Sequence, residues 1–172
     1  MGIMKDYWLA KLISSVTEVD SRKRLQKSIY LLQQAGCPLQ LSYILHYYGP
    51  YSFELAGLID QLKGAGIIDE SAAQTGFGSI RYKSKINNKK GKRVLKKFEE
   101  TKDGKQSMAK ITPFTPLFKD LNEKDPWVLE LAATVAYFYE GDWSEAQKQT
   151  ATFKKLSKND NNLKQAFALA SA

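Results

Sequence analysis

The spacing of hydrophobic residues between positions 22 and 63 predicts two amphipathic helices. In the first, residues 22–34, the apolar positions share one helical face and the basic and amide side chains fall elsewhere. In the second, residues 52–63, leucine and isoleucine recur at i, i+3, i+4 and i+7. Each pattern ends in a helix-stop signal, Gly36-Cys37-Pro38 after the first and Gly64-Ala65-Gly66 after the second.

Two short strands are predicted after the second helix. Residues 67–70 form the first, and residues 80–86 form the second, in which apolar side chains alternate with cationic ones. Thr75-Gly76-Phe77-Gly78-Ser79 supplies a turn between them. Two helices followed by such a hairpin predict a helix-turn-helix with a wing.

Helices are predicted on both sides of this unit. Residues 6–19 carry an apolar stripe at helical spacing, and the capping-box sequence Asp142-Trp143-Ser144-Glu145 opens a helix near the C-terminus, followed by a last one over 162–170. The helix predicted over 127–140 is apolar nearly all round and must therefore be covered. Cover by the same chain is favoured over a second copy, because it is the commoner case.

These elements define a mainly α fold with a small β-hairpin, that is, a winged helix-turn-helix followed by a C-terminal helical extension. The expected organisation is a winged helix-turn-helix domain over 1–104, a linker over 105–124 and a C-terminal helical region over 125–172 that packs on the first domain. The linker is inferred from its polar composition and from Pro113 and Pro116. With 43% apolar residues among 172, the chain can bury a proper core.

Charge is distributed unevenly along the chain, which carries a net +8. Between positions 71 and 98 there is no acidic residue, whereas the rest of the chain is close to neutral. A charge run is more often a solvated surface than a site. Here, however, it spans the wing strand, the following loop and the next helix, an arrangement that suits a phosphate backbone. The candidate nucleic-acid-binding residues are Arg81, Lys83, Lys85, Lys89, Lys90, Lys92, Arg93, Lys96 and Lys97.

Catalytic and metal chemistry find no support in the residue pattern. The single cysteine, Cys37, excludes an intramolecular disulfide, and the single histidine, His46, has no partner with which to anchor a metal or a catalytic triad. We therefore expect a protein that is not an enzyme, with no cofactor and no metal. The apolar runs are too short to span a membrane and the N-terminus does not resemble a signal peptide, so a cytoplasmic location is expected.

Three segments carry a resemblance to a known family. Residues 25–39, residues 48–55 around Tyr48-Gly49-Pro50-Tyr51, and residues 129–134 are similar to the YwgA-like proteins of bacteria and archaea. More distantly, the Leu25-Gln26-Lys27 helix and the Tyr-Gly-Pro turn resemble the Panacea antitoxin domain. The resemblance implies a winged-helix fold and a regulatory, toxin-neutralising or defence-associated setting without established enzymatic activity.

The leading functional hypothesis is nucleic-acid binding, with DNA favoured over RNA. The second predicted helix exposes Glu54 and Asp60, which would face phosphates, so contact is expected through the wing and residues 89–97 with little base readout. The alternative is an antitoxin-like interaction module that binds a protein partner or forms a homodimer. Its candidate interface lies on the apolar helix, at Trp127, Leu131, Val135 and Phe138.

Overall fold

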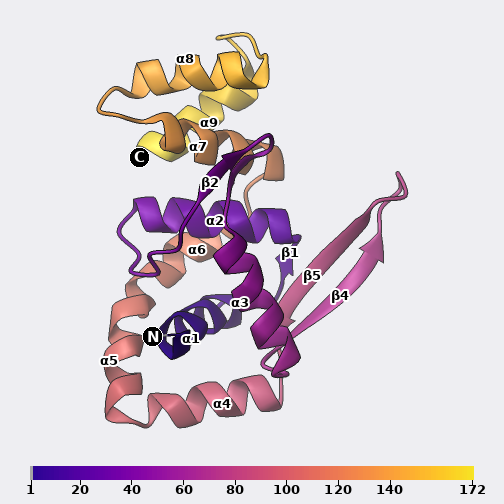
Figure 1. Cartoon of the computed structure of the whole chain (residues 1–172), viewed down its shortest axis with the longest axis vertical. Coiled ribbons are helices and arrows are strands. Elements are labelled where there is room, and N and C mark those ends of the chain that lie inside the picture. Colours follow the sequence, from indigo (N-terminus) through magenta and orange to yellow (C-terminus); the bar gives the residue numbers. More distant parts are fainter. Residues whose placement is uncertain (1) are drawn as a thin grey trace.

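The computed structural model describes the backbone of residues 2–172, and the side chains from Met4 onward. The helices are α1 (Gly2–Ser14), α2 (Arg22–Gln34), α3 (Phe53–Gly64), α4 (Lys90–Glu99), α5 (Lys102–Ile111), the 3₁₀ turn η1 (Thr112–Phe114), α6 (Thr115–Asn122), α7 (Pro126–Phe138), α8 (Trp143–Lys154) and α9 (Asn161–Ser171). The strands are β1 (Val19–Asp20), β2 (Ile44–His46), β3 (Gly49–Tyr51), β4 (Ile68–Gln74) and β5 (Ile80–Ile86). The chain is thus mainly helical, and α2 crosses its middle between α7–α9 on one side and α1, α3 and α4–α6 on the other (Figure 1).

Local sequence explains where α2 and α3 begin. The Ser21 hydroxyl accepts a hydrogen bond from the Arg24 N–H (3.1 Å), and the Ser52 hydroxyl accepts one from the Leu55 N–H (3.0 Å). Each serine thereby satisfies one of the backbone donors that a helix start leaves open. The helix predicted over 22–34 is confirmed, and the one predicted over 52–63 is shifted by one residue.

The first helix ends earlier than predicted. The sequence pattern extends it over 6–19, whereas α1 ends at Ser14 and Val19–Asp20 forms strand β1. In β1, Val19 pairs with Ser84 of β5, far away in sequence. Hydrophobic spacing cannot reveal such a partner, and a β-branched residue such as Val19 is suited to the strand it forms.

A three-stranded antiparallel sheet contains the predicted hairpin. Its strand order is β1-β5-β4, with Ile68 opposite Ile86 at the buried base and Gln74 opposite Ile80 near the tip. Strand β5 has the predicted bounds, but β4 continues four residues beyond Glu70, because each of those residues finds a partner on β5. The hairpin projects from the body of the molecule (Figure 1).

A second hairpin, made of β2 and β3, was not predicted. Its strands pair antiparallel, with Ile44 opposite Tyr51, and its turn requires Gly49 at φ +93°. The Gln26 side chain fastens the end of this hairpin to α2, because its amide bonds both the N–H and the C=O of Ser52 at 2.8 Å. The hairpin therefore covers one flank of α2 and of α7.

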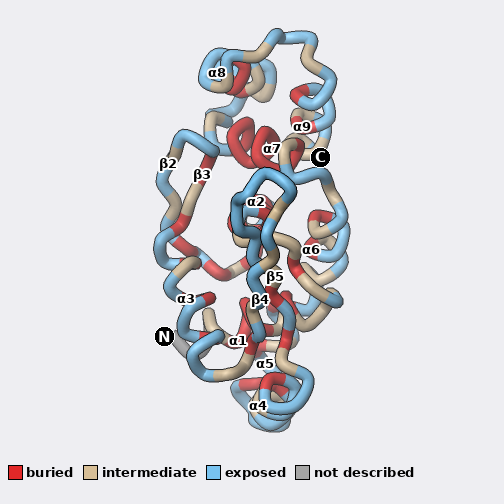
Figure 2. The backbone as a smooth tube through the Cα atoms, turned by 90° about the vertical axis from the view of Figure 1, so that its right-hand side faces the viewer, coloured by how far each residue is buried: buried red, intermediate tan, exposed pale blue. Residues whose placement is uncertain are grey.

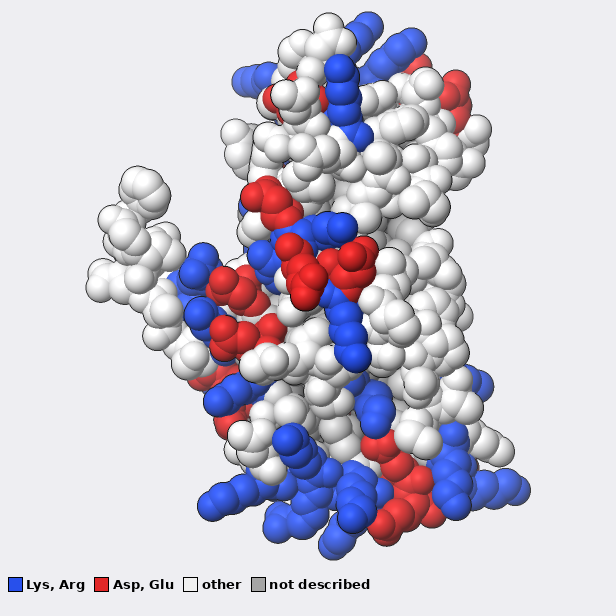
Figure 3. Space-filling model, turned by 180° about the vertical axis from the view of Figure 1, so that it is seen from behind, with Lys and Arg blue, Asp and Glu red and all other residues white. Residues whose placement is uncertain are grey.

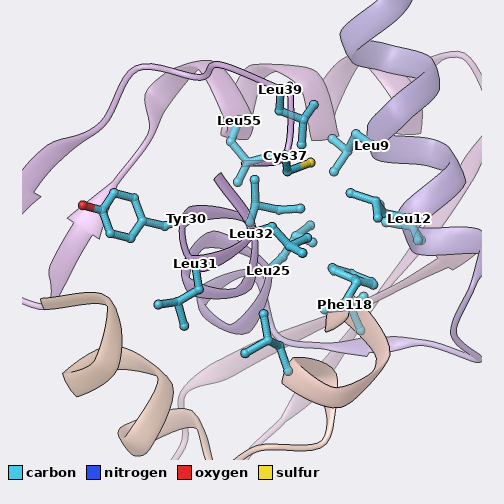
Figure 4. Packing of buried hydrophobic residues seen from close by; sticks show 14 of the residues in the cluster. Leu9, Leu12, Leu25, Tyr30, Leu31, Leu32, Cys37, Leu39, Leu55 and Phe118 are labelled. Atoms are coloured by element: carbon cyan, nitrogen blue, oxygen red, sulfur yellow. The ribbon is translucent and has the colours of Figure 1, made fainter. Parts of the chain in front are cut away.

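The predicted linker over 105–124 is helical for most of its length. Ile111, Phe118 and Leu121 are buried in the main core, where Phe118 lies near the side chains of α1 and α2 (Figure 4). Pro113 and Pro116 lie in the first turns of η1 and α6, positions where the missing N–H costs nothing. The two prolines therefore start new helical turns and do not mark a flexible connection.

Helix α7 is buried by its own chain. Its side chains from Val128 to Ala136 are buried, and it packs against α2, α8 and α9 (Figures 1 and 2). Intramolecular cover, the alternative favoured from the sequence, is therefore confirmed. Every helix within residues 2–172 is too short or too polar to cross a lipid bilayer.

Replacing Gly104 by alanine should destabilise the protein. A Cβ at this position would lie 1.7 Å from the carbonyl oxygen of Phe98, so the backbone where α5 meets α4 would have to move. We expect Gly104→Ala to lower the free energy of unfolding by about 1–3 kcal/mol, measured by urea denaturation. Gly57→Ala is the matched control, because nothing lies within 4 Å of its Cβ in α3, and it should raise stability by about 1 kcal/mol. A Gly104→Ala protein as stable as wild type would contradict this packing.

Candidate nucleic-acid interface

Two of the nine predicted cations are neutralised by acidic partners. Arg81 Nε lies 3.0 Å from Asp20 Oδ1, and Lys83 Nζ lies 3.4 Å from Glu18 Oε1. Both acids lie on or next to β1, about 60 positions earlier in the chain, so the sequence pattern did not reveal them. Basic and acidic side chains accordingly alternate along the base of the hairpin, whereas its tip carries no charge (Figure 3). The wing strand is therefore less positive than its sequence suggested.

The other seven cations are exposed. Among the side chains of residues 4–172, none of these seven forms an ion pair within 4.0 Å. They gather at the end of the molecule that α4 forms (Figures 1 and 3). The set is Lys85, Lys89, Lys90, Lys92, Arg93, Lys96 and Lys97.

The packing of α4 directs these cations outward. The side-chain oxygen Oδ1 of Asn87 accepts hydrogen bonds from the backbone N–H groups of Lys89 (3.0 Å) and Lys90 (2.7 Å), which starts the helix. Gly91 and Leu95 face inward, and a Cβ on Gly91 would lie only 2.2 Å from a backbone oxygen of Ile67. The inward side of α4 is thus held against the core, and the basic positions remain in solvent.

Helix α3 offers little to an anion. Glu54 pairs with Lys5 (2.9 Å), and Asp60 pairs with Arg22 (2.9 Å). The hydrogen bond from Lys5 lowers the pKa of Glu54, so this carboxylate stays charged on the exposed side of α3. The two acids that the sequence indicated on this helix thus each have a cationic partner from another element.

A buried charge cluster, which the sequence analysis missed, joins α2, α7 and α8. Glu130 of α7 is 3% exposed; its Oε2 lies 2.5 Å from Lys154 Nζ, and its Oε1 lies 2.5 Å from Lys23 Nζ. The Lys154 ammonium also donates to the carbonyl of Tyr47 (3.0 Å). The one signal of this cluster in the sequence is Glu130 itself, a carboxylate within the most apolar helix of the chain. A buried carboxylate needs a charged partner.

The candidate interface on α7 is not available in this fold. Leu131 and Val135 have no exposed surface. Trp127 and Phe138 are partly buried, and the Phe138 ring lies 5.8 Å from that of Phe153 on α8. The prediction that this apolar face meets a partner is therefore wrong for Leu131 and Val135, because α2, α8 and α9 already cover it.

Cys37 and His46 occupy structural positions. Burial raises the pKa of the Cys37 thiol to about 11, which disfavours the reactive thiolate. His46 stacks on Tyr48 with ring centroids 5.2 Å apart. Within residues 2–172, no group of three His, Cys, Asp or Glu side chains is placed to hold a metal ion.

Together these features define a mainly helical protein with a small antiparallel sheet and one strongly basic end. No protein-family model matches the chain. Over 157 residues it is 28% identical to a protein of Bacillus subtilis (strain 168) named "Uncharacterized protein YwgA", in an alignment that covers 89% of this chain and 86% of that protein. This similarity supports the resemblance to the YwgA-like proteins across most of the chain.

Proposed function

We propose that the chain is a winged-helix protein that binds nucleic acid, DNA in preference to RNA, through the phosphate backbone, in a regulatory or defence setting. The order α1-β1-α2-β2-β3-α3-β4-β5, in which the β2–β3 hairpin is inserted between the two helices, and the strand order β1-β5-β4 support the winged-helix part of this proposal. In such a fold the second helix of the helix-turn-helix enters the major groove. Here that helix is α3, whose acids Glu54 and Asp60 are unfavourable next to phosphates.

The observation that carries the proposal is the group of seven exposed cations on α4 and beside it, which form no ion pair with any described side chain. Their side chains lie on a helix fixed to the core and on the adjoining turn and strand. Lysine and arginine side chains that contact phosphates release condensed counterions, which supplies affinity without reading sequence. Binding should therefore be sequence-independent. Arg81 and Lys83 contribute less than the sequence suggested, because their charges are already compensated.

Fluorescence anisotropy with labelled duplex DNA, single-stranded DNA and RNA, each titrated over a range of salt, tests the proposal. We expect binding whose log–log salt slope is steep and similar for unrelated duplex sequences. Absence of binding to all three nucleic acids near physiological salt would contradict it.

A protein-interaction or antitoxin-like function is the second candidate, and a different surface favours it. Large apolar side chains are exposed on and beside the β2–β3 hairpin, with Tyr47 90%, Phe53 65% and Ile44 50% exposed. Exposed apolar patches mark interaction sites more often than isolated apolar residues do. Binding of a partner protein that survives loss of the α4 charges would favour this candidate.

A further inference from the structure

A cavity lies between α2, α3 and the β2–β3 hairpin. Its volume is about 360 Å³, within the range of small-molecule sites, and most of its wall is apolar. Lys27 and Gln26 of α2 line it together with Tyr48 and Tyr51 of the hairpin. It is separate from the basic face of α4, which contributes none of the lining residues.

Lys27 is a buried cation that no acid among the described side chains contacts. Its side chain is 1% exposed, and its Nζ donates to the carbonyl of Pro50 at 2.7 Å. An ammonium carries three donors. Within the described side chains, residues 4–172, no carboxylate lies within 4.0 Å of Lys27 Nζ, and the nearby Glu130 is taken up by Lys23 and Lys154. A buried charge of this kind is costly unless an anion completes its environment.

The other cations of the cavity are held in place. Arg22 bonds both carboxylate oxygens of Glu70 at 2.7 Å and Asp60 at 2.9 Å. Lys23 is paired with Glu130. Lys27 is therefore the cation with bonding capacity left for a ligand.

Two tyrosines provide flat surfaces beside this cation. Tyr48 and Tyr51 stand nearly perpendicular, at 87°, with ring centroids 6.0 Å apart. The Lys27 ammonium lies 5.3 Å from the centre of the Tyr48 ring. Aromatic rings stack on planar bases whatever the base sequence, because every base has a π face.

We infer that this cavity binds one nucleotide unit, with its phosphate at Lys27 and its base against Tyr48 and Tyr51. The unit is either a free mononucleotide or an unpaired nucleotide of a strand. Both offer the same anion and planar ring, and the experiment below separates them. This site is distinct from the phosphate-backbone contacts proposed for α4, so either proposal can stand without the other.

Binding should depend on pH through Lys27. Burial lowers the pKa of Lys27 to about 8; the charge of Glu130 on α7 opposes this effect, while Lys23 on α2 and Lys154 on α8 add to it. The hairpin presents two phenols to the cavity, those of Tyr48 and Tyr51. A phosphate monoester carries its second negative charge only above about pH 6. Because the ammonium attracts the phosphate, affinity should be nearly constant between about pH 7 and pH 8 and fall about tenfold per pH unit above pH 8.

Isothermal titration calorimetry with AMP and UMP at pH 7, and with a short thymidine oligonucleotide, tests the inference. Lys27→Met should weaken binding at least about tenfold, because it removes a charge-assisted hydrogen bond, and should abolish the fall in affinity above pH 8. Tyr48→Leu, at a half-exposed position that tolerates change, should weaken it at least about fivefold. The triple variant Lys148→Gln, Lys158→Gln, Lys164→Gln removes the charge of three lysines that do not line the cavity and should bind like wild type.

The results distinguish a free-nucleotide site, a site for a nucleotide of a strand and the absence of a site. Saturable binding of AMP or UMP that depends on Lys27 supports a free-nucleotide site, and Lys27-dependent binding of the oligonucleotide alone supports an unpaired nucleotide of a strand. Binding of neither, or binding that survives both Lys27→Met and Tyr48→Leu, overturns the inference. If the protein binds duplex DNA but shows no binding of AMP, UMP or the oligonucleotide that depends on Lys27 and Tyr48, this inference is overturned and the α4 proposal stands.

Discussion

Replacing Lys92, Lys96 and Lys97 by glutamine should weaken binding to duplex DNA about tenfold or more near physiological salt. These side chains are exposed on α4 and have no acidic partner among the described side chains of residues 4–172. If each contacts one phosphate, the log–log salt slope should become shallower by about 0.9 for each, or roughly 2.7 in total. The loss should be similar for unrelated sequences, because backbone contacts carry no base information. Salt-titrated fluorescence anisotropy measures both quantities.

The matched control for this variant is Lys148→Gln, Lys158→Gln, Lys164→Gln. These lysines are also exposed, and the variant removes the same net charge, but from the α8–α9 end of the molecule (Figure 1). The control should keep nearly all of the wild-type affinity. An equal loss in both variants would show that net charge alone drives binding, and an unchanged affinity in the α4 variant would remove α4 from the interface.

Replacing Glu130 by glutamine should lower the free energy of unfolding by about 3 kcal/mol. Glu130 is 3% exposed, and the Lys154 side chain that it contacts at 2.5 Å is 7% exposed. Removing one partner of a buried pair leaves the other charge uncompensated, which costs about 3–5 kcal/mol. The contact with Lys23 adds little, because that side chain is 43% exposed and screened by water. Urea denaturation followed by circular dichroism measures the change.

Two further variants separate a charge effect from a packing effect at Glu130. Glu123→Gln removes an exposed carboxylate and should change stability by less than about 0.5 kcal/mol. Glu130→Gln combined with Lys154→Met removes both charges and should recover part of the lost stability, because no buried cation is then left without its acid. A double variant less stable than Glu130→Gln alone would assign the effect to packing.

The most local features of the chain were the most predictable. The bounds of α2 and of β5, and nearly those of α3, follow from hydrophobic spacing and from serine caps that act within three residues. The apolar face of α7 also showed in advance that this helix had to be covered. For the candidate site, the location of the cations on α4 was readable, because Gly91 and Leu95 interrupt them at helical spacing.

The errors share a different origin. From the local sequence, Pro113 and Pro116 indicate a linker, although proline is equally common in the first turn of a helix. Only the burial of Ile111 and Phe118 shows that the helical alternative applies. Hydrophobic spacing extends the first helix to Val19, because the strand partner of Val19, Ser84, lies 65 positions away. Both predictions are wrong because they depend on contacts between residues far apart in the sequence, which a local pattern does not contain.

The sequence by itself determined the mainly helical content, the caps of α2 and α3 and the run of positive charge, because these depend on neighbours a few positions apart. The tertiary structure alone decided which charges remain free. Asp20 neutralises Arg81, and Lys154 neutralises Glu130. Lys27 and Tyr48 line the same cavity, and the Lys27 ammonium lies beside the Tyr48 ring. Tyr48 belongs to the β2–β3 hairpin, which the local sequence pattern did not predict. Electrostatic attraction acts over a few ångströms of space, and only the packed chain brings groups so distant in sequence within that range.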